Sequence, residues 1–211
     1  MKKIICILSG ILLLASCTKS PLSELEMEAA TTSADVSATA AKPRLVNTVP
    51  QFVLYTIPAG QHSSDKSVIK SVKVTTMNFV AKFDNSVIYQ SVIPENQYDI
   101  NKLYGFSEGF NHQYNSARIG WAYNDGALRL YAYAYNNGVR EYREITTVTI
   151  GTEVSCSISV SRFLYTFTVN NVSVTLPRAN STTTASGYQL YPYFGGDEVA
   201  PQNIYISIKH L

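Results

Sequence analysis

The feature that most constrains this chain is an alternation of apolar and polar residues from Arg118 to Ile150, broken only by two turn dipeptides. Asp125-Gly126 and Asn137-Gly138 each separate two alternating runs, and such dipeptides are the strongest local signals of two-residue β-hairpins. Because successive side chains on a strand point to opposite faces, this stretch predicts three consecutive antiparallel strands. Val148 and Ile150 have the opposite parity to Ile145, so a bulge in the third strand could switch its faces.

Pairing across Asp125-Gly126 predicts which side chains share each face of this sheet. One face is apolar, with cross-strand pairs Tyr123–Leu128, Trp121–Leu130 and Ile119–Ala132. The other face holds small residues beside rings and guanidinium groups: Arg118, Gly120 and Ala122 beside Arg129, Tyr131, Tyr133 and Tyr135. We expect a shallow trough on this second face, because glycine and alanine leave space above the sheet.

The remaining strand signals extend along most of the chain. A third hairpin is expected at Asn170-Asn171, with Phe167 opposite Val174 and Tyr165 opposite Leu176. Further strands are predicted at residues 52–57, 70–83, 87–92, 98–103, 154–160, 188–194 and 203–209. No segment has a helical pattern of convincing length. About ten antiparallel strands without a disulfide predict an all-β protein made of two packed sheets.

The N-terminal segment has the pattern of an export signal. Lys2 and Lys3 precede an apolar run over residues 4–14, which is too short to span a membrane as a helix. The residues Leu14-Ala15-Ser16-Cys17 resemble a bacterial lipobox. This resemblance implies removal of residues 1–16 and lipidation of Cys17. We therefore expect a lipid-anchored protein of the bacterial cell envelope, at the outer membrane.

A composition change separates this anchor from the folded part. All 15 Tyr and all eight Phe follow Arg44, and residues 29–41 are almost entirely Ala, Thr and Ser. We expect residues 17–44 to be a disordered, flexible tether and residues 45–211 to form one β-sandwich domain. Loss of Cys6 and lipidation of Cys17 leave Cys156 as the only free thiol, and its strand-like neighbours predict a buried, inert side chain.

Charge and composition exclude several functional classes. The formal charge is +2, and removal of Lys2 and Lys3 leaves 15 basic residues against 15 acidic ones. A nucleic-acid binder normally gathers many more Lys and Arg on one surface, so no nucleic-acid partner is expected. Three His and three Cys, widely spaced, predict no metal centre. The low charge and many tyrosines favour a neutral or weakly acidic glycan as ligand.

The folded part also resembles a known superfamily. Gly120-Trp121 in a central strand, the hairpin segment Tyr165–Asn171 and a closing strand at residues 204–208 are similar to the concanavalin A-like lectins and glucanases. The resemblance implies a jelly-roll sandwich with a curved sheet whose concave face or rim handles carbohydrate. Because such folds host both lectins and enzymes, the site must decide the function.

The candidate residues favour binding over hydrolysis. A glycosidase needs two carboxylates across the scissile bond, and the glucanase pattern Glu-x-Asp-x-x-Glu is missing from this sequence. A polysaccharide lyase needs an acid/base pair and a group that neutralises a carboxylate. His112, Arg118 and Tyr193 could form that set, and the segment Tyr191-Pro192-Tyr193-Phe194 loosely resembles the Tyr-Phe segment of jelly-roll alginate lyases. Lyase activity is therefore the enzymatic alternative.

The leading hypothesis is a non-catalytic carbohydrate-binding lipoprotein. Aromatic rings stack on sugars, and planar polar groups bind hydroxyls. The predicted ligand-binding residues are Arg118, Arg129, Tyr131, Tyr133 and Tyr135, with Tyr142, His112 and Asn115 at the rim. The expected partners are a polysaccharide or oligosaccharide and the membrane, and a protein-binding or adhesion module is a further alternative. No cofactor is expected, although Asp84-Asn85 or Asp197-Glu198 could hold a structural calcium.

Overall fold

A computed structural model of the chain describes residues 49–211. The predicted signal peptide, Cys17, the tether and the first residues of the predicted domain lie outside the described residues, and those expectations stay predictions. Twelve strands and two short 3₁₀ helices, η1 (Asn85–Val87) and η2 (Pro94–Tyr98), make up the described part. Within it, no helix is long and apolar enough to cross a membrane.

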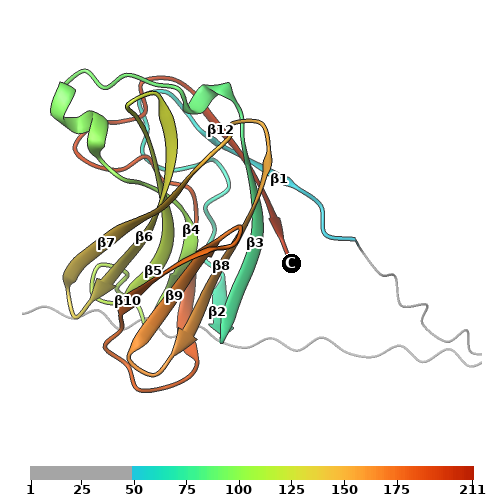
Figure 1. Cartoon of the computed structure of the whole chain (residues 1–211), viewed down its shortest axis with the longest axis vertical. Coiled ribbons are helices and arrows are strands. Elements are labelled where there is room, and N and C mark those ends of the chain that lie inside the picture. The colour runs from blue at the N-terminus through green and yellow to red at the C-terminus, as the bar shows by residue number, and fades with distance from the viewer. Residues whose placement is uncertain (1–48) are drawn as a thin grey trace, which may run out of the picture. The chain divides into compact units, whose positions relative to one another are not determined.

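The strands form two antiparallel sheets of six strands each (Figure 1). The first sheet has, in spatial order, β1 (Val53–Ile57), β12 (Ile204–His210), β3 (Thr76–Phe83), β8 (Glu153–Ser161), β9 (Leu164–Val169) and β10 (Val172–Pro177). The second has β2 (Ser71–Val74), β11 (Ala185–Leu190), β4 (Asn101–Ser107), β5 (Ser116–Asn124), β6 (Ala127–Asn136) and β7 (Val139–Val148). The pairing of β1 with the last strand is the long-range closure of a jelly-roll sandwich, so the predicted fold class is confirmed.

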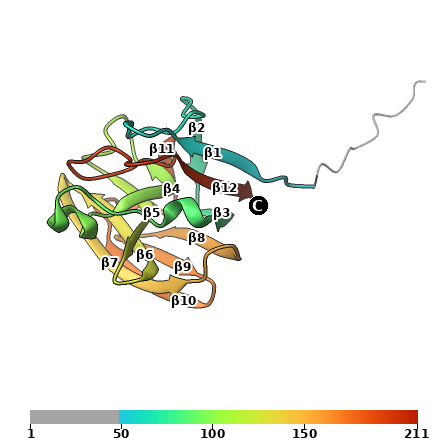
Figure 2. The ribbon, with the colours of Figure 1, turned by 90° about the horizontal axis from the view of Figure 1, so that it is seen from above.

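The core lies between the two sheets, which face one another in Figure 2. Trp121 of β5 is fully buried there and contacts the rings of Phe83, Tyr89 and Phe194. Each fully buried large apolar side chain contributes roughly 1.5–3 kcal/mol relative to exposure. This shared core holds the second sheet against the first, so the outward face of the second sheet is a rigid platform.

The predicted hairpins are confirmed in register. Tyr123, Trp121 and Ile119 lie opposite Leu128, Leu130 and Ala132, as expected. Both residues of Asp125-Gly126 and of Asn137-Gly138 have positive φ, which is the backbone of a two-residue hairpin turn. In the Asn170-Asn171 hairpin, Phe167 pairs with Val174 and Tyr165 with Leu176.

The bulge suggested by the parity change lies in β7. Leu130 pairs with Thr146 but Tyr131 pairs with Glu144, so Ile145 is the extra residue. Ile145 is buried. The bulge therefore lets β7 turn this apolar side chain inward while Tyr142 and Glu144 stay opposite Tyr133 and Tyr131.

Four strand predictions were wrong in detail. The strand expected at 98–103 begins only at Asn101, after η2, and extends to Ser107, and the strand expected at 188–194 begins at Ala185 and ends at Leu190. The segment 87–92 is no strand: Asp84 accepts a hydrogen bond from the Ser86 amide and caps η1, and the Gln202 side chain donates to the Ser86 and Ile88 carbonyls. These side-chain bonds replace the partners that a neighbouring strand would supply. Residues 70–83 form two strands, because the chain passes from the second sheet (β2) to the first (β3) near Thr75.

Candidate functional site

A groove of about 720 Å³ lies on the outward face of the second sheet. Its floor comes from β4, β5, β6, β7 and β11, and its walls come from residues 63–69, 112–113 and 191–197. The side chains that matter for its chemistry are Lys102, His112, Arg118, Tyr133, Tyr135, Arg140, Tyr188 and Tyr193. Five of these eight residues belong to the sets predicted from the sequence: Arg118, Tyr133 and Tyr135 were predicted to bind the ligand, and His112 and Tyr193 belong with Arg118 to the lyase alternative.

Only half of the predicted trough is open. Ile100, which precedes β4, packs above Gly120, so that a Cβ at Gly120 would lie 2.5 Å from its Cγ2 atom. Ile100 also forms a small apolar cluster with Ala122 and Tyr131. The groove therefore lies toward β4 and β11, over Arg118 rather than over Gly120 and Ala122.

Arg118 is the centre of the groove. Its side chain extends from β5 opposite Tyr133 of β6, and only 6% of the residue is exposed. Burial lowers the pKa of its guanidinium, and the nearby hydroxyls of Tyr133, Tyr135, Tyr188 and Tyr193 act in the opposite direction. Its Nε is buried without a hydrogen-bond partner. A ring of tyrosines thus surrounds a cation that has no anionic partner among the described residues.

Two more cations line the groove near Arg118. Lys102 of β4 places its Nζ 5.0 Å from the centre of the Tyr133 ring, and Arg140 of β7 pairs with Tyr135. Burial, together with the charges of Arg118 and Arg140, lowers the pKa of Lys102 to about 8. The overall charge of the chain is low, but these three cations concentrate positive charge in the groove. Composition alone favoured a neutral or weakly acidic glycan over a highly charged one and did not indicate this concentration.

The candidate acid/base residues also reach this groove. His112 Nδ1 lies 2.7 Å from the Tyr188 hydroxyl, and burial and the charge of Arg118 lower the pKa of His112. Tyr193 stacks on His62, with ring centres 5.3 Å apart, and its backbone forms two hydrogen bonds with Lys102. The structure thus places His112, Arg118 and Tyr193 around one cavity, from three separate parts of the chain.

Other predicted residues lie elsewhere. Arg129 does not line the groove; it contacts Asn124, Asp125 and Glu144 at the hairpin end of β5 and β6. Tyr131 is buried beneath Ile100 rather than in the groove. This part of the predicted ligand set is therefore separated from Arg118 by the segment before β4.

The predicted rim residues also have separate places. Asn115 accepts a hydrogen bond from the Asn137 amide and supports the β6–β7 turn. Tyr142 lines a small notch beside the groove.

Sequence reasoning missed Lys102, Arg140 and Tyr188. Lys102 and Tyr188 come from β4 and β11, which pair although they lie far apart in the sequence, so local patterns could not place these two residues together. The available signal was parity for Arg140, which is two residues before Tyr142 and shares its strand face.

In the loops considered for calcium, Asp84 and Glu198 use their carboxylates in other contacts, whereas Asp197 lines the groove. Asp84 caps η1, and Glu198 accepts hydrogen bonds from the Val92 and Ile93 amides and from Asn96. Across residues 49–211, no three His, Cys, Asp or Glu side chains cluster in a way that could hold a metal ion. Cys156 is buried in β8 as expected, and burial raises its thiol pKa.

Comparison with known proteins identifies no family. No family model and no curated protein matches the chain. A family 7 alginate lyase in complex with product has a TM-score of 0.47 at 11% identity, over 76% of this chain and 80% of that one. An alginate lyase from Alteromonas sp. 272 gives 0.46 at 11% identity, over 79% and 88%. A carbohydrate-binding module from Bacillus subtilis gives 0.34 at 5% identity, over 72% and 91%. At such values the chain is similar to these proteins in strand arrangement alone.

Proposed function

We propose that this chain is a carbohydrate-binding lipoprotein whose groove holds a polysaccharide or oligosaccharide without cleaving it. The observation that carries the proposal is the open groove of about 720 Å³ in which tyrosines surround the unpaired Arg118 guanidinium. Tyrosine rings suit the C–H faces of sugars, and a guanidinium offers several donors in one plane. A pre-formed groove with few polar groups fixed on a rigid sheet is a typical ligand site.

A glycan array tests this proposal with two matched variants. Arg118→Met removes the guanidinium at the groove centre, whereas Arg129→Met makes the same change outside the groove. We expect wild type and Arg129→Met to retain the same glycans and Arg118→Met to lose roughly tenfold or more in affinity. Absence of binding to any glycan by folded wild-type protein would overturn the proposal.

The lyase alternative has its own supporting observation. The lowered pKa of His112 favours a neutral imidazole near pH 7, which is the form that can accept a proton. Tyr188 and Tyr193 supply hydroxyls, and Arg118 could neutralise a uronate carboxylate. In such a reaction the base removes the proton next to the carboxylate, the electron pair forms a double bond in the sugar ring, and the glycosidic bond breaks as its oxygen takes a proton from a tyrosine hydroxyl.

Absorbance of unsaturated products tests for lyase activity. Wild-type protein and a His112→Ala variant would be incubated with a panel of uronate polysaccharides. Activity that depends on His112 establishes the enzymatic alternative, whereas glycan binding without product formation supports the non-catalytic function.

The proposed location is the outer membrane of a bacterial cell envelope, through lipid on Cys17. The lipobox-like residues before Cys17 support it, and a multiply acylated terminus would anchor stably. Metabolic labelling with a fatty-acid analogue should mark the wild-type chain, whereas a Cys17→Ser variant should remain unlabelled. Equal labelling of both would contradict this anchor.

A further inference from the structure

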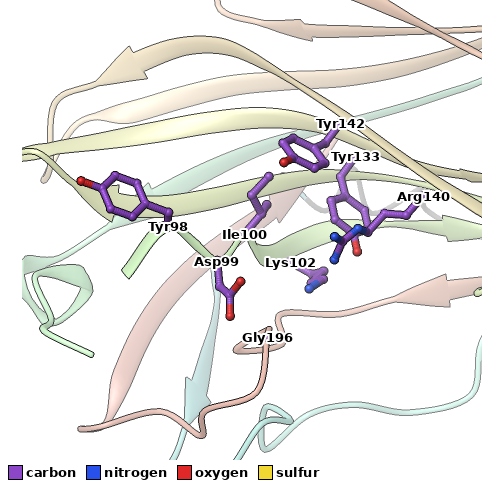
Figure 3. A pocket seen from close by; sticks show the side chains of 8 residues that line it. All are labelled: Tyr98, Asp99, Ile100, Lys102, Tyr133, Arg140, Tyr142 and Gly196. Carbon is purple, nitrogen blue, oxygen red and sulfur yellow. The ribbon is translucent and has the colours of Figure 1, made fainter. Parts of the chain in front are cut away.

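A small notch adjoins the groove at the β6–β7 side of the platform. It has a volume of about 60 Å³ and is lined by Tyr98, Asp99, Lys102, Tyr133, Arg140 and Tyr142, among others (Figure 3). Lys102, Tyr133 and Arg140 line the notch and the groove alike. The two hollows are therefore parts of one continuous surface that passes over Tyr133.

The notch carries two cations without a paired anion. Among residues 49–211, neither Lys102 nor Arg140 forms an ion pair. Asp99 lies close by, but its carboxylate packs against Gly196, where an added Cβ would lie 1.8 Å from Oδ2. Figure 3 shows the ends of the Lys102 and Arg140 side chains on the same side of the notch, while Asp99 points toward Gly196. Besides burial, the charge of Arg140 lowers the pKa of Lys102 and the Asp99 carboxylate raises it, so a further anion in the notch would relieve the repulsion between the two cations.

The notch has room for a charged substituent. Its volume of about 60 Å³ exceeds the roughly 10–15 Å³ that one water molecule needs. A carboxylate or sulfate group therefore fits beside Lys102 and Arg140. The rim offers rings for the sugar itself, because Tyr98 is 61% exposed and Tyr142 is 55% exposed.

We propose that the notch is a second subsite, in which Lys102 and Arg140 bind a carboxylate or sulfate substituent of an anionic polysaccharide. This inference rests on the proposed carbohydrate-binding function and specifies its ligand class. Arg118 holds one anionic group in the groove, Tyr133 lies beneath the chain, and the notch holds the anionic group of a further sugar. The ligand is therefore a chain with repeated negative charges, rather than a single charged sugar.

Two further features fit this assignment. The lowered pKa of Lys102 reflects burial and neighbouring cations, and a bound anion would raise this pKa again. The loop over the notch is Gly195-Gly196, and an added Cβ at Gly195 would lie 2.2 Å from Lys102 Nζ. Glycine there lets the backbone close over the Lys102 side chain.

Titration calorimetry with a length series of uronic-acid oligomers tests the second subsite. The probes are polygalacturonate and polymannuronate oligomers, their carboxyl-reduced counterparts with the same backbones, and dextran sulfate against plain dextran. Arg140→Gln removes a notch cation, and Arg143→Gln makes the same change on β7 away from both hollows. Arg118→Met removes the guanidinium at the centre of the groove and so measures how much the groove itself contributes to binding.

For either anionic probe class, we expect Arg140→Gln to weaken the longer oligomers roughly 10-fold to 100-fold and to leave the shortest bound oligomer within about twofold. Arg143→Gln should match wild type. Preference for the polyuronates identifies a carboxylate as the occupant, and preference for dextran sulfate identifies a sulfate. If neutral and anionic chains bind equally and Arg140→Gln has no effect, the second subsite is wrong although carbohydrate binding stands. If no glycan binds at all, the proposed function and this inference both fail.

Discussion

Two arginines buried in the same sandwich have opposite surroundings. Arg178, 2% exposed, forms a two-pronged ion pair with Glu108 at 2.6 and 2.8 Å and also donates to carbonyls of residues 161, 180, 182 and 184. Arg118, 6% exposed, has no carboxylate partner among the described residues and leaves Nε unsatisfied. A buried charge is expensive unless it is paired. The difference indicates that Arg178 stabilises the fold, whereas Arg118 faces an open cavity that can admit an external anion.

The largest expected effect is on the paired arginine. Glu108→Ala leaves Arg178 buried without its counter-ion, and breaking a buried pair in this way typically costs about 3–5 kcal/mol. Urea unfolding at pH 7 measures the loss. Glu153→Ala is the matched control, since Glu153 makes only an exposed contact of 3.5 Å to Lys209, and it should cost less than about 1 kcal/mol. Similar losses in the two variants would contradict the role of the buried pair.

The unpaired arginine should respond in the opposite direction. Arg118→Met replaces a buried, unpartnered charge with an apolar side chain of similar length. We expect the free energy of unfolding to rise by about 1–2 kcal/mol, at the expense of glycan binding. Urea unfolding of the same preparation used for binding checks this. A loss of stability instead would mean that the guanidinium supports the fold through its tyrosine neighbours.

The two arginines should also differ in how their surroundings make stability depend on pH, because only Arg178 is paired with a carboxylate. Burial raises the pKa of Glu108, but hydrogen bonds from Arg178, Tyr165 and Asn180 outweigh it and leave the pKa below the ordinary value of 4.5. A carboxyl group with a lowered folded-state pKa contributes stability above its unfolded pKa, and this contribution disappears as the pH falls through the folded value.

Unfolding free energies measured between pH 7 and pH 3 test this linkage. Wild type should lose stability below about pH 4.5 more steeply than Glu108→Gln, which has no carboxyl group to protonate. Arg118→Met should keep the wild-type slope, because Arg118 has no paired carboxylate. Parallel curves for wild type and Glu108→Gln would show that Glu108 does not carry the acid sensitivity.

The smallest effect is expected at Arg129, which lies on the same sheet as Arg118. Its contacts with Asp125 at 3.7 Å and Glu144 at 3.1 Å are partly exposed, and such pairs contribute about 0–1 kcal/mol. Arg129→Met should therefore change stability by less than about 1 kcal/mol. A larger loss would show that this contact network, rather than the buried pair alone, supports the hairpin.

The central hairpins could be predicted in register because their determinants are local. Two-residue turns and a period of two decide which side chains oppose one another, as in the pair Trp121–Leu130. The segment 87–92 could not be predicted correctly, since its backbone partners include Gln202, more than 110 residues away along the chain. Apolar residues there pack against the core without belonging to a sheet.

The candidate site likewise has one part that local sequence predicts and another part that it does not. The shared face of Arg118, Tyr133 and Tyr135 follows from the alternation and the turn. The alternation does not predict that Tyr131 and Arg129 lie outside the groove. Their position depends on Ile100, which comes from another part of the chain and covers that half of the face. The sequence contains Ile100, but no local pattern states where it packs.

The all-β class, the hairpin registers and the faces of β5 and β6 follow from local sequence, because neighbouring residues and turn chemistry control them. Long-range packing, by contrast, brings Lys102, Arg118 and Arg140 together around Tyr133 and pairs Arg178 with Glu108. These contacts depend on the order of the strands in the sheets and on the loops that cover them. The chain has almost balanced charge in total, so only its folding concentrates positive charge in one groove.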